Sequence, residues 1–125
     1  MKKVIVLAMM LCSMTLLAAE FVFADNGKAK FTIVLPEKTA EFEDLAAKDL
    51  QKFFNQMSGA DFKIVKESAA PAKNAIYIGK TNFSLKHKVF PEKLTAETWV
   101  IKPIDGNLIL SGGYPVGCFY AVWNL

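Results

Sequence analysis

The side chains that could do chemistry are few in this sequence. Hydrolysis of a glycosidic bond needs two carboxyl groups held roughly 5 to 10 Å apart across a sugar-sized cleft. Glu43 and Asp44 are adjacent, but their position predicts the polar side of a helix near its N-terminus, where the helix dipole favours acids. The sequence therefore predicts no catalytic carboxylate pair.

Metal, nucleophile and phosphate chemistry also lack their usual patterns. His87 is the single histidine, and neither Cys-x-x-Cys nor His-Glu-x-x-His occurs, so we expect no metal and no other cofactor. Ser58 and Ser111 have no nucleophile-elbow context. The glycine-rich stretch 111–117 lacks the spacing of a phosphate loop and favours a tight turn from a strand into a helix.

Tyr114 and Asp49 are the candidates for contact with a ligand or a neighbouring domain. Tyr114 is the one aromatic residue that we expect in a turn. Asp49 falls inside the apolar arc of a predicted helix, where a carboxylate needs a partner. The alternative interpretation is a flanking acid bonded to a loop or to Lys52. The other aromatic residues occupy positions typical of a core: Phe53, Tyr77, Trp99, Phe119 and Trp123.

Composition excludes several classes of protein. A chain of 125 residues suffices for one compact domain and not for a complete barrel enzyme. It contains no arginine, its net charge is +3 and its lysines are scattered among acids, so we expect no nucleic-acid binding. Cys118 is the one cysteine outside the N-terminal segment, and we expect it to be a buried, apolar residue.

The N-terminal segment has the pattern of a secretory signal. Lys2 and Lys3 precede an apolar run from Val4 to Ala19. We predict a signal peptide over residues 1–24 and a mature domain over residues 25–125. The alternative is a retained membrane anchor. The mature protein is expected to be exported, periplasmic or extracellular, without attachment to a membrane.

Alternating and β-branched runs predict an α/β fold, with a mixed sheet of about five strands and helices packed on one face. A helix is predicted between Thr39 as N-cap and Gly59. Asp105 and Gly106 predict a hairpin, and residues 80–96 a loop with up to one helical turn. The predicted strands are 31–35, 62–65, 75–79, 98–102 and 107–111. The helix is expected to cover the sheet with Phe42, Leu45, Ala46, Leu50, Phe53 and Met57.

The last segment, residues 116–125, predicts a helix that is apolar on all sides. Val116, Phe119, Tyr120 and Trp123 occupy one side. One side can pack on the sheet, and the other would leave several hundred Å² of apolar surface uncovered. We therefore expect a chain truncated ahead of another domain, or one with an obligatory partner.

Four segments resemble, in order, the N-terminal domain of bacterial α-glucuronidases. They are similar also to the second domain of family 20 β-hexosaminidases and to a related domain of large polysaccharide-degrading proteins. The resemblance covers nearly all of the mature chain. Val116 and Cys118 depart from it, because relatives often have arginine at the first position and threonine or alanine at the second. The four segments are 46–65, 76–81, 107–113 and 117–122.

The resemblance implies a small α/β domain that precedes a (β/α)₈ catalytic barrel in the same polypeptide. In those families the hydrolytic acids lie on the barrel, so no catalytic residue is carried over. The implied function is a non-catalytic accessory domain of an exported glycoside hydrolase in polysaccharide breakdown, with the missing barrel as partner and carbohydrate as a candidate ligand.

Two alternatives stay open. A self-contained carbohydrate-binding module would need an exposed aromatic platform, and a small hydrolase would need a close carboxylate pair. Which glycan is involved does not follow from the sequence, because specificity would lie on the barrel.

Overall fold

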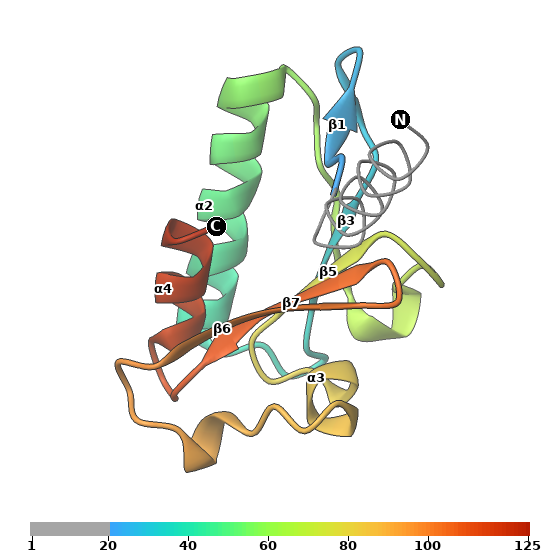
Figure 1. The fold of residues 1–125 in the computed structure, drawn as a ribbon. Helices are drawn as coiled ribbons and strands as arrows, with labels where there is room; N and C mark the ends of the chain where they lie inside the picture. Colours follow the sequence, from blue (N-terminus) through green and yellow to red (C-terminus); the bar gives the residue numbers. More distant parts are fainter. Residues whose placement is uncertain (1–20) are drawn as a thin grey trace, which may run out of the picture.

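The computed structural model describes residues 21–125, so the predicted signal peptide lies mostly outside the described residues. The centre of the fold is a five-stranded sheet in the order β4-β3-β5-β7-β6 (Figure 1). Four strands are parallel, and β6 runs antiparallel to β7. The strands are β3 (Thr32–Leu35), β4 (Ile64–Lys66), β5 (Ala75–Ile78), β6 (Trp99–Ile104) and β7 (Asn107–Gly112).

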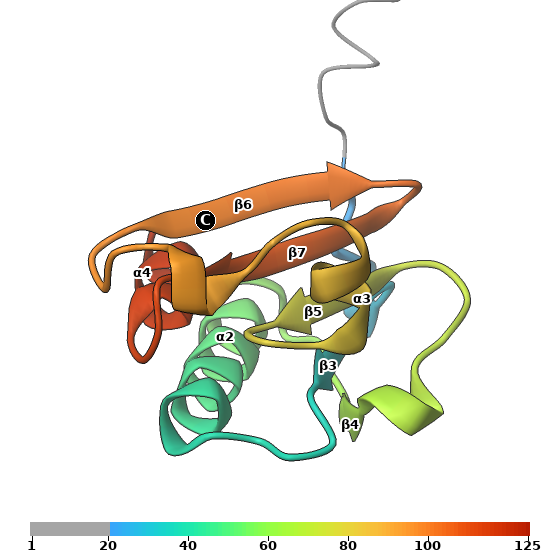
Figure 2. The ribbon, with the colours of Figure 1, turned by 90° about the horizontal axis from the view of Figure 1, so that it is seen from below.

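Helices pack against this sheet, which confirms the predicted α/β fold. The two longer ones, α2 (Glu41–Ser58) and α4 (Gly117–Trp123), lie side by side against one face (Figures 1 and 2). The short α3 (Asn82–Lys86) is the helical turn predicted within residues 80–96. Its Phe83 ring stacks on Tyr77 at 4.1 Å, on the face opposite α2. Two short 3₁₀ segments also occur among residues 21–125, η1 (Glu67–Ala69) and η2 (Pro91–Lys93).

The central strands are buried on both faces, which explains their unbroken apolar runs. All residues of β5 and β7 are buried. Alternate side chains point to opposite faces of a strand, so Ile76 and Ile78 join the core under α2 and α4, whereas Tyr77 joins the second cluster.

The helix α2 is rotated relative to the predicted arc. Its buried stripe is Glu43, Ala46, Ala47, Leu50 and Phe54. The prediction was wrong for Phe42, Leu45, Phe53 and Met57, which are exposed, Met57 by 74%. The small alanine side chains allow α2 to approach the sheet, and the larger apolar residues are left on its outer side.

The two ends of α2 differ in how well the sequence predicted them. Gly59 ends the helix at φ 73°, as expected, and its N–H donates to the carbonyl of Asn55 (2.8 Å). The predicted cap Thr39 is wrong, because Ala40 is the N-cap and the Thr39 hydroxyl donates to the carbonyl of Pro36 (2.7 Å).

The β6–β7 hairpin forms where Asp105–Gly106 predicts it. Both turn residues have positive φ, 49° and 81°, as the favoured two-residue hairpin turns require. β6 is an edge strand, so Pro103 near its end is tolerated although it has no N–H to donate.

A small N-terminal hairpin covers one end of the core. It consists of β1 (Ala24–Asp25) and β2 (Lys28–Ala29). The ring of Phe23 lies 5.1 Å from that of Phe31 and 5.0 Å from that of Phe54, between centroids. Phe23 and its neighbours thus contribute to packing, although the predicted signal peptide extends to residue 24. That boundary stays a prediction.

Candidate functional site

A crevice opens where the parallel strands β3 and β5 end. These strands are neighbours, but the chain leaves β3 through α2 on one face and β5 through α3 on the other. Loops that diverge in this way leave a space at the carboxyl ends of the strands, the usual place for ligands in such sheets. The crevice measures about 640 Å³. Its lining includes the loop 36–40, Glu43, Glu67, Lys80, Asn82, Leu85, Glu92 and Tyr114.

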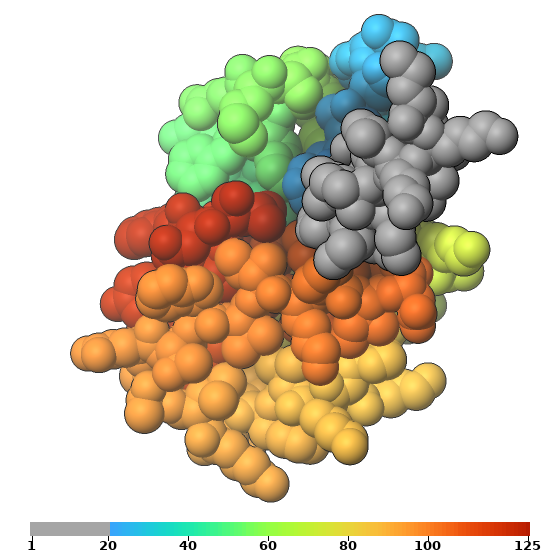
Figure 3. Space-filling model, in the orientation of Figure 1, coloured from blue at the N-terminus to red at the C-terminus, as the bar shows by residue number. Residues whose placement is uncertain are grey.

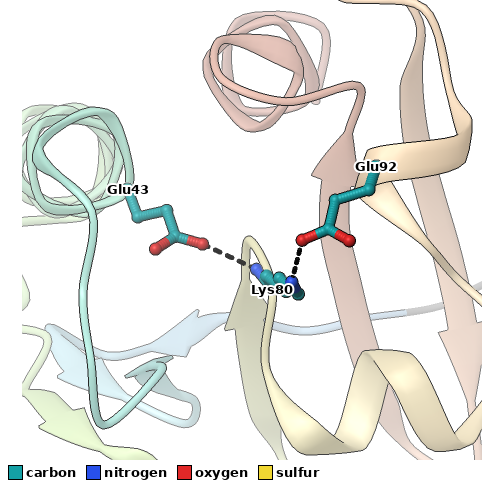
Figure 4. A network of polar contacts seen from close by, with 3 residues as sticks. All are labelled: Glu43, Lys80 and Glu92. Atoms are coloured by element: carbon teal, nitrogen blue, oxygen red, sulfur yellow. Dashed lines mark hydrogen bonds and ion pairs between the residues drawn. The ribbon is translucent and has the colours of Figure 1, made fainter.

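Glu43 closes the floor of the crevice. Its side chain is only 5% exposed. One carboxylate oxygen accepts from the N–H of Ala40 (2.8 Å). The other accepts from the N–H of Lys80 (2.6 Å) (Figure 4). A single carboxylate therefore ties the loop after β3 to the loop after β5. The expectation that Glu43 lies on the polar side of its helix was wrong; its spacing of three and four from Ala46 and Ala47 was the signal for burial.

Gly79 makes this contact sterically feasible. Its φ is 80°, in the left-handed region, and a Cβ atom added there would lie 2.6 Å from Cγ of Glu43. Any larger residue at this position would displace the carboxylate.

The other carboxylates of the lining have partners of their own. Glu92 forms an ion pair with the ammonium of Lys80 (Figure 4). The two oxygens of Glu67 accept from the N–H groups of Asn82 and Phe83, both at 2.8 Å, at the start of α3. Hydrogen bonds from Ser68 hold the pKa of Glu37 below its ordinary value of 4.5. These groups are oriented acceptors rather than free acids.

The described residues of this region offer neither a cluster of metal ligands nor a reactive thiol. Within residues 21–125, no three side chains of the histidine, cysteine, aspartate and glutamate types are grouped so as to hold a metal ion. Burial, together with the nearby carboxylate of Glu43, raises the pKa of the Cys118 thiol to about 12. The thiol is therefore protonated at neutral pH and is a poor nucleophile.

The structure places the two predicted contact residues on different surfaces. Tyr114 is 55% exposed and lines the crevice. Asp49 is half-buried on α2, outside the crevice lining, and accepts from the indole N–H of Trp123 at 3.4 Å. Its partner is thus on α4, and neither Lys52 nor a loop supplies it.

Trp123 belongs to an apolar surface that we name the α2–α4 face, formed by Phe42, Leu45, Phe53, Met57 and Trp123. Trp123 is 60% exposed and Trp99, at the start of the edge strand, is 48% exposed. The expectation of core positions was wrong for both, because one lies at the sheet edge and the other on the outer side of the last helix. In the space-filling view α4 (red) lies between α2 (green) and the orange segment that contains β6 (Figure 3).

No helix in the described part of the chain combines the length and apolarity needed to cross a membrane. In the comparisons with known proteins, no protein-family model matches the chain and no curated protein matches its sequence.

Proposed function

We propose that this chain is a non-catalytic accessory domain of an exported glycoside hydrolase, and that its α2–α4 face packs against the catalytic barrel. The four-segment resemblance supports the class of enzyme. The exposed apolar side chains of α2 and α4 support a docking role, and this surface is the observation on which the proposal chiefly depends.

The α2–α4 face is continuous rather than scattered. Phe42, Leu45, Asp49 and Phe53 follow one another at spacings of three and four, which places them on one stripe of the helix. The Trp123 indole reaches Asp49 in the middle of this stripe. Large apolar side chains gathered in this way are typical of an interface with another protein or domain.

The composition of the face favours a protein partner over a sugar. Leu45 and Met57 are aliphatic and flexible, and such side chains pack well against irregular protein surfaces. A sugar ring stacks instead on flat aromatic groups. Asp49 accepts a hydrogen bond from the indole of Trp123, so its carboxylate keeps this bond when a docking partner covers both residues.

The test begins with the coding sequence downstream of the Leu125 codon, where the proposal expects a barrel with a carboxylate pair. That barrel and the full chain would then be expressed as separate proteins, and their association measured by titration calorimetry. Finding no barrel-like sequence downstream or in an adjacent reading frame would argue against the proposal.

Variants locate the interface. Trp123→Ala should weaken the association by about 30-fold, as expected for a central aromatic residue. Phe90→Ala is the matched control, because Phe90 is an exposed aromatic residue outside α2 and α4, and it should leave the affinity unchanged. Equal affinities for the wild-type chain and the Trp123 variant would contradict docking through this face.

The carbohydrate-binding module is a second candidate, favoured by the exposure of both Trp99 and Trp123. For a carbohydrate-binding module we expect the chain to sediment with an insoluble polysaccharide such as cellulose, xylan or chitin. Binding should be lost in the Trp99→Ala, Trp123→Ala double variant and kept in Phe90→Ala. Failure to sediment with any of the three would remove this candidate and leave the docking proposal untouched.

A further inference from the structure

We infer that the crevice between the β3–α2 and β5–α3 loops binds a neutral sugar. This site is separate from the α2–α4 face, and the inference goes beyond the accessory role. It depends on three features of the lining: the sign of its charge, the state of its carboxylates and the position of its aromatic side chain.

The charge of the lining disfavours anionic ligands. Four glutamates line the crevice, against the two lysines Lys38 and Lys80. Lys80 is already paired with Glu92. A phosphate or a uronic acid would enter a space that carries excess negative charge, and the glutamate carboxylates would repel its own negative charge. A neutral ligand meets no such penalty.

The carboxylates suit hydroxyl donors better than metal cations. Those of Glu43 and Glu67 are fixed by two backbone N–H groups each. A carboxylate has about four acceptor sites, so each can still accept from a ligand hydroxyl without breaking these bonds. Coordination of a divalent cation would require carboxylates that converge on one point, and among residues 21–125 no such group is present.

Hydrogen-bond donors and an aromatic ring complete the groups with which the crevice would recognise a sugar. The side chains of Asn82 and Lys38 line the crevice and form no hydrogen bond with another described residue. Tyr114 supplies a half-exposed ring on the same lining. A pyranose presents hydroxyls around its rim and C–H groups on its face, which match this combination of acceptors, donors and one aromatic ring.

The hydroxyl of Ser111 gives independent support. Ser111 is fully buried, and its Oγ is without a hydrogen-bond partner in the described chain. It lines a small adjoining cavity of about 10 Å³ that shares Glu43, Lys80 and Tyr114 with the crevice. A buried hydroxyl without a partner is costly. A cavity of this size accepts one hydroxyl-sized group.

The test uses the purified full chain labelled with ¹⁵N and titrated with methyl glycosides of glucose, xylose, galactose and N-acetylglucosamine. Methyl glucuronide is the anionic comparison. We expect at least one neutral glycoside to shift the amide signals of Lys80, Asn82 and Tyr114, and the glucuronide to bind more weakly. No shift with any neutral probe at millimolar concentration would overturn the inference, as would equal binding of the glucuronide.

Variants separate this inference from the proposed function. Tyr114→Ala should weaken the binding about tenfold, whereas Tyr114→Phe and Phe90→Ala should leave it unchanged; native amide spectra verify folding. Loss of binding in Trp123→Ala with no effect of Tyr114→Ala would place the sugar on the α2–α4 face and refute the crevice site. Absence of sugar binding with intact barrel association would refute the crevice site alone.

Discussion

Glu43 is the residue whose replacement tests the architecture of the crevice most directly. In Glu43→Gln one side-chain oxygen still accepts a backbone N–H, but the amide NH₂ faces the other N–H and cannot accept from it. The two bonds at stake are those from Ala40 (2.8 Å) and Lys80 (2.6 Å). A hydrogen bond to a charged group contributes about 1.5 to 3 kcal/mol, so the free energy of unfolding should fall by about 2 kcal/mol.

Urea unfolding followed by far-UV circular dichroism measures this loss, with an unchanged m-value as the sign of an unchanged unfolding reaction. For a domain of this size Tm should fall by about 8 to 16 °C. Glu41→Gln is the matched control, because Glu41 is an exposed acid in the same first turn of α2. Its effect should stay below about 0.5 kcal/mol.

Equal losses in the two variants would refute the reasoning, since Glu43 would then act only through the helix dipole. Hydrogen exchange supplies a second readout. The Lys80 amide should exchange faster in Glu43→Gln, whereas the Tyr77 amide in the centre of the sheet should change only with global stability. Unchanged protection at Lys80 would show that the bond does not hold the loop.

Two further predictions concern the buried thiol of Cys118 and the partly buried ring of Phe23. Cys118 is protonated in the fold up to a pKa of about 12, against an ordinary 9.0; its contribution to stability is therefore complete below pH 9.0 and lost as pH rises towards 12. Urea midpoints should show a flatter alkaline decline in Cys118→Ala, and an identical decline would contradict this. In the chain that still carries residues 21–24, Phe23→Ala should cost about 2 kcal/mol in urea unfolding, because Phe23 packs on Phe31 and Phe54. Val22→Ala, at an exposed site, should cost almost nothing; equal losses would refute the packing role.

The strands were predictable because each carries its own signal. The β-branched run near residues 32–35 and the Asp105–Gly106 turn depend on local backbone preferences. The order of strands in the sheet has no such local signal, because it depends on which connections pass over which face. The crevice arises from that order, so its position did not follow from the sequence.

Side-chain orientation on α2 was the main failure. Counting large apolar residues favoured the stripe with Phe42 and Met57 as the buried side of the helix. Burial depends instead on how closely the helix can approach the sheet, and the small side chains of Ala46 and Ala47 are therefore the ones that face it. Glu43 then faces inward because Ala40 and Lys80 supply donors. Lys80 lies on a loop far from Glu43 in the sequence, and a single sequence does not indicate that the two are close in space.

The proline in the edge strand has a consequence for how copies of this protein meet. Pro103, the fifth of the six residues of β6, removes a backbone donor near the end of this strand, and at the other border β4 has only three residues. A neighbouring polypeptide would thus find no long run of free backbone groups with which to extend the sheet. Both edges of the sheet therefore disfavour the addition of further strands and, with it, the growth of fibrils.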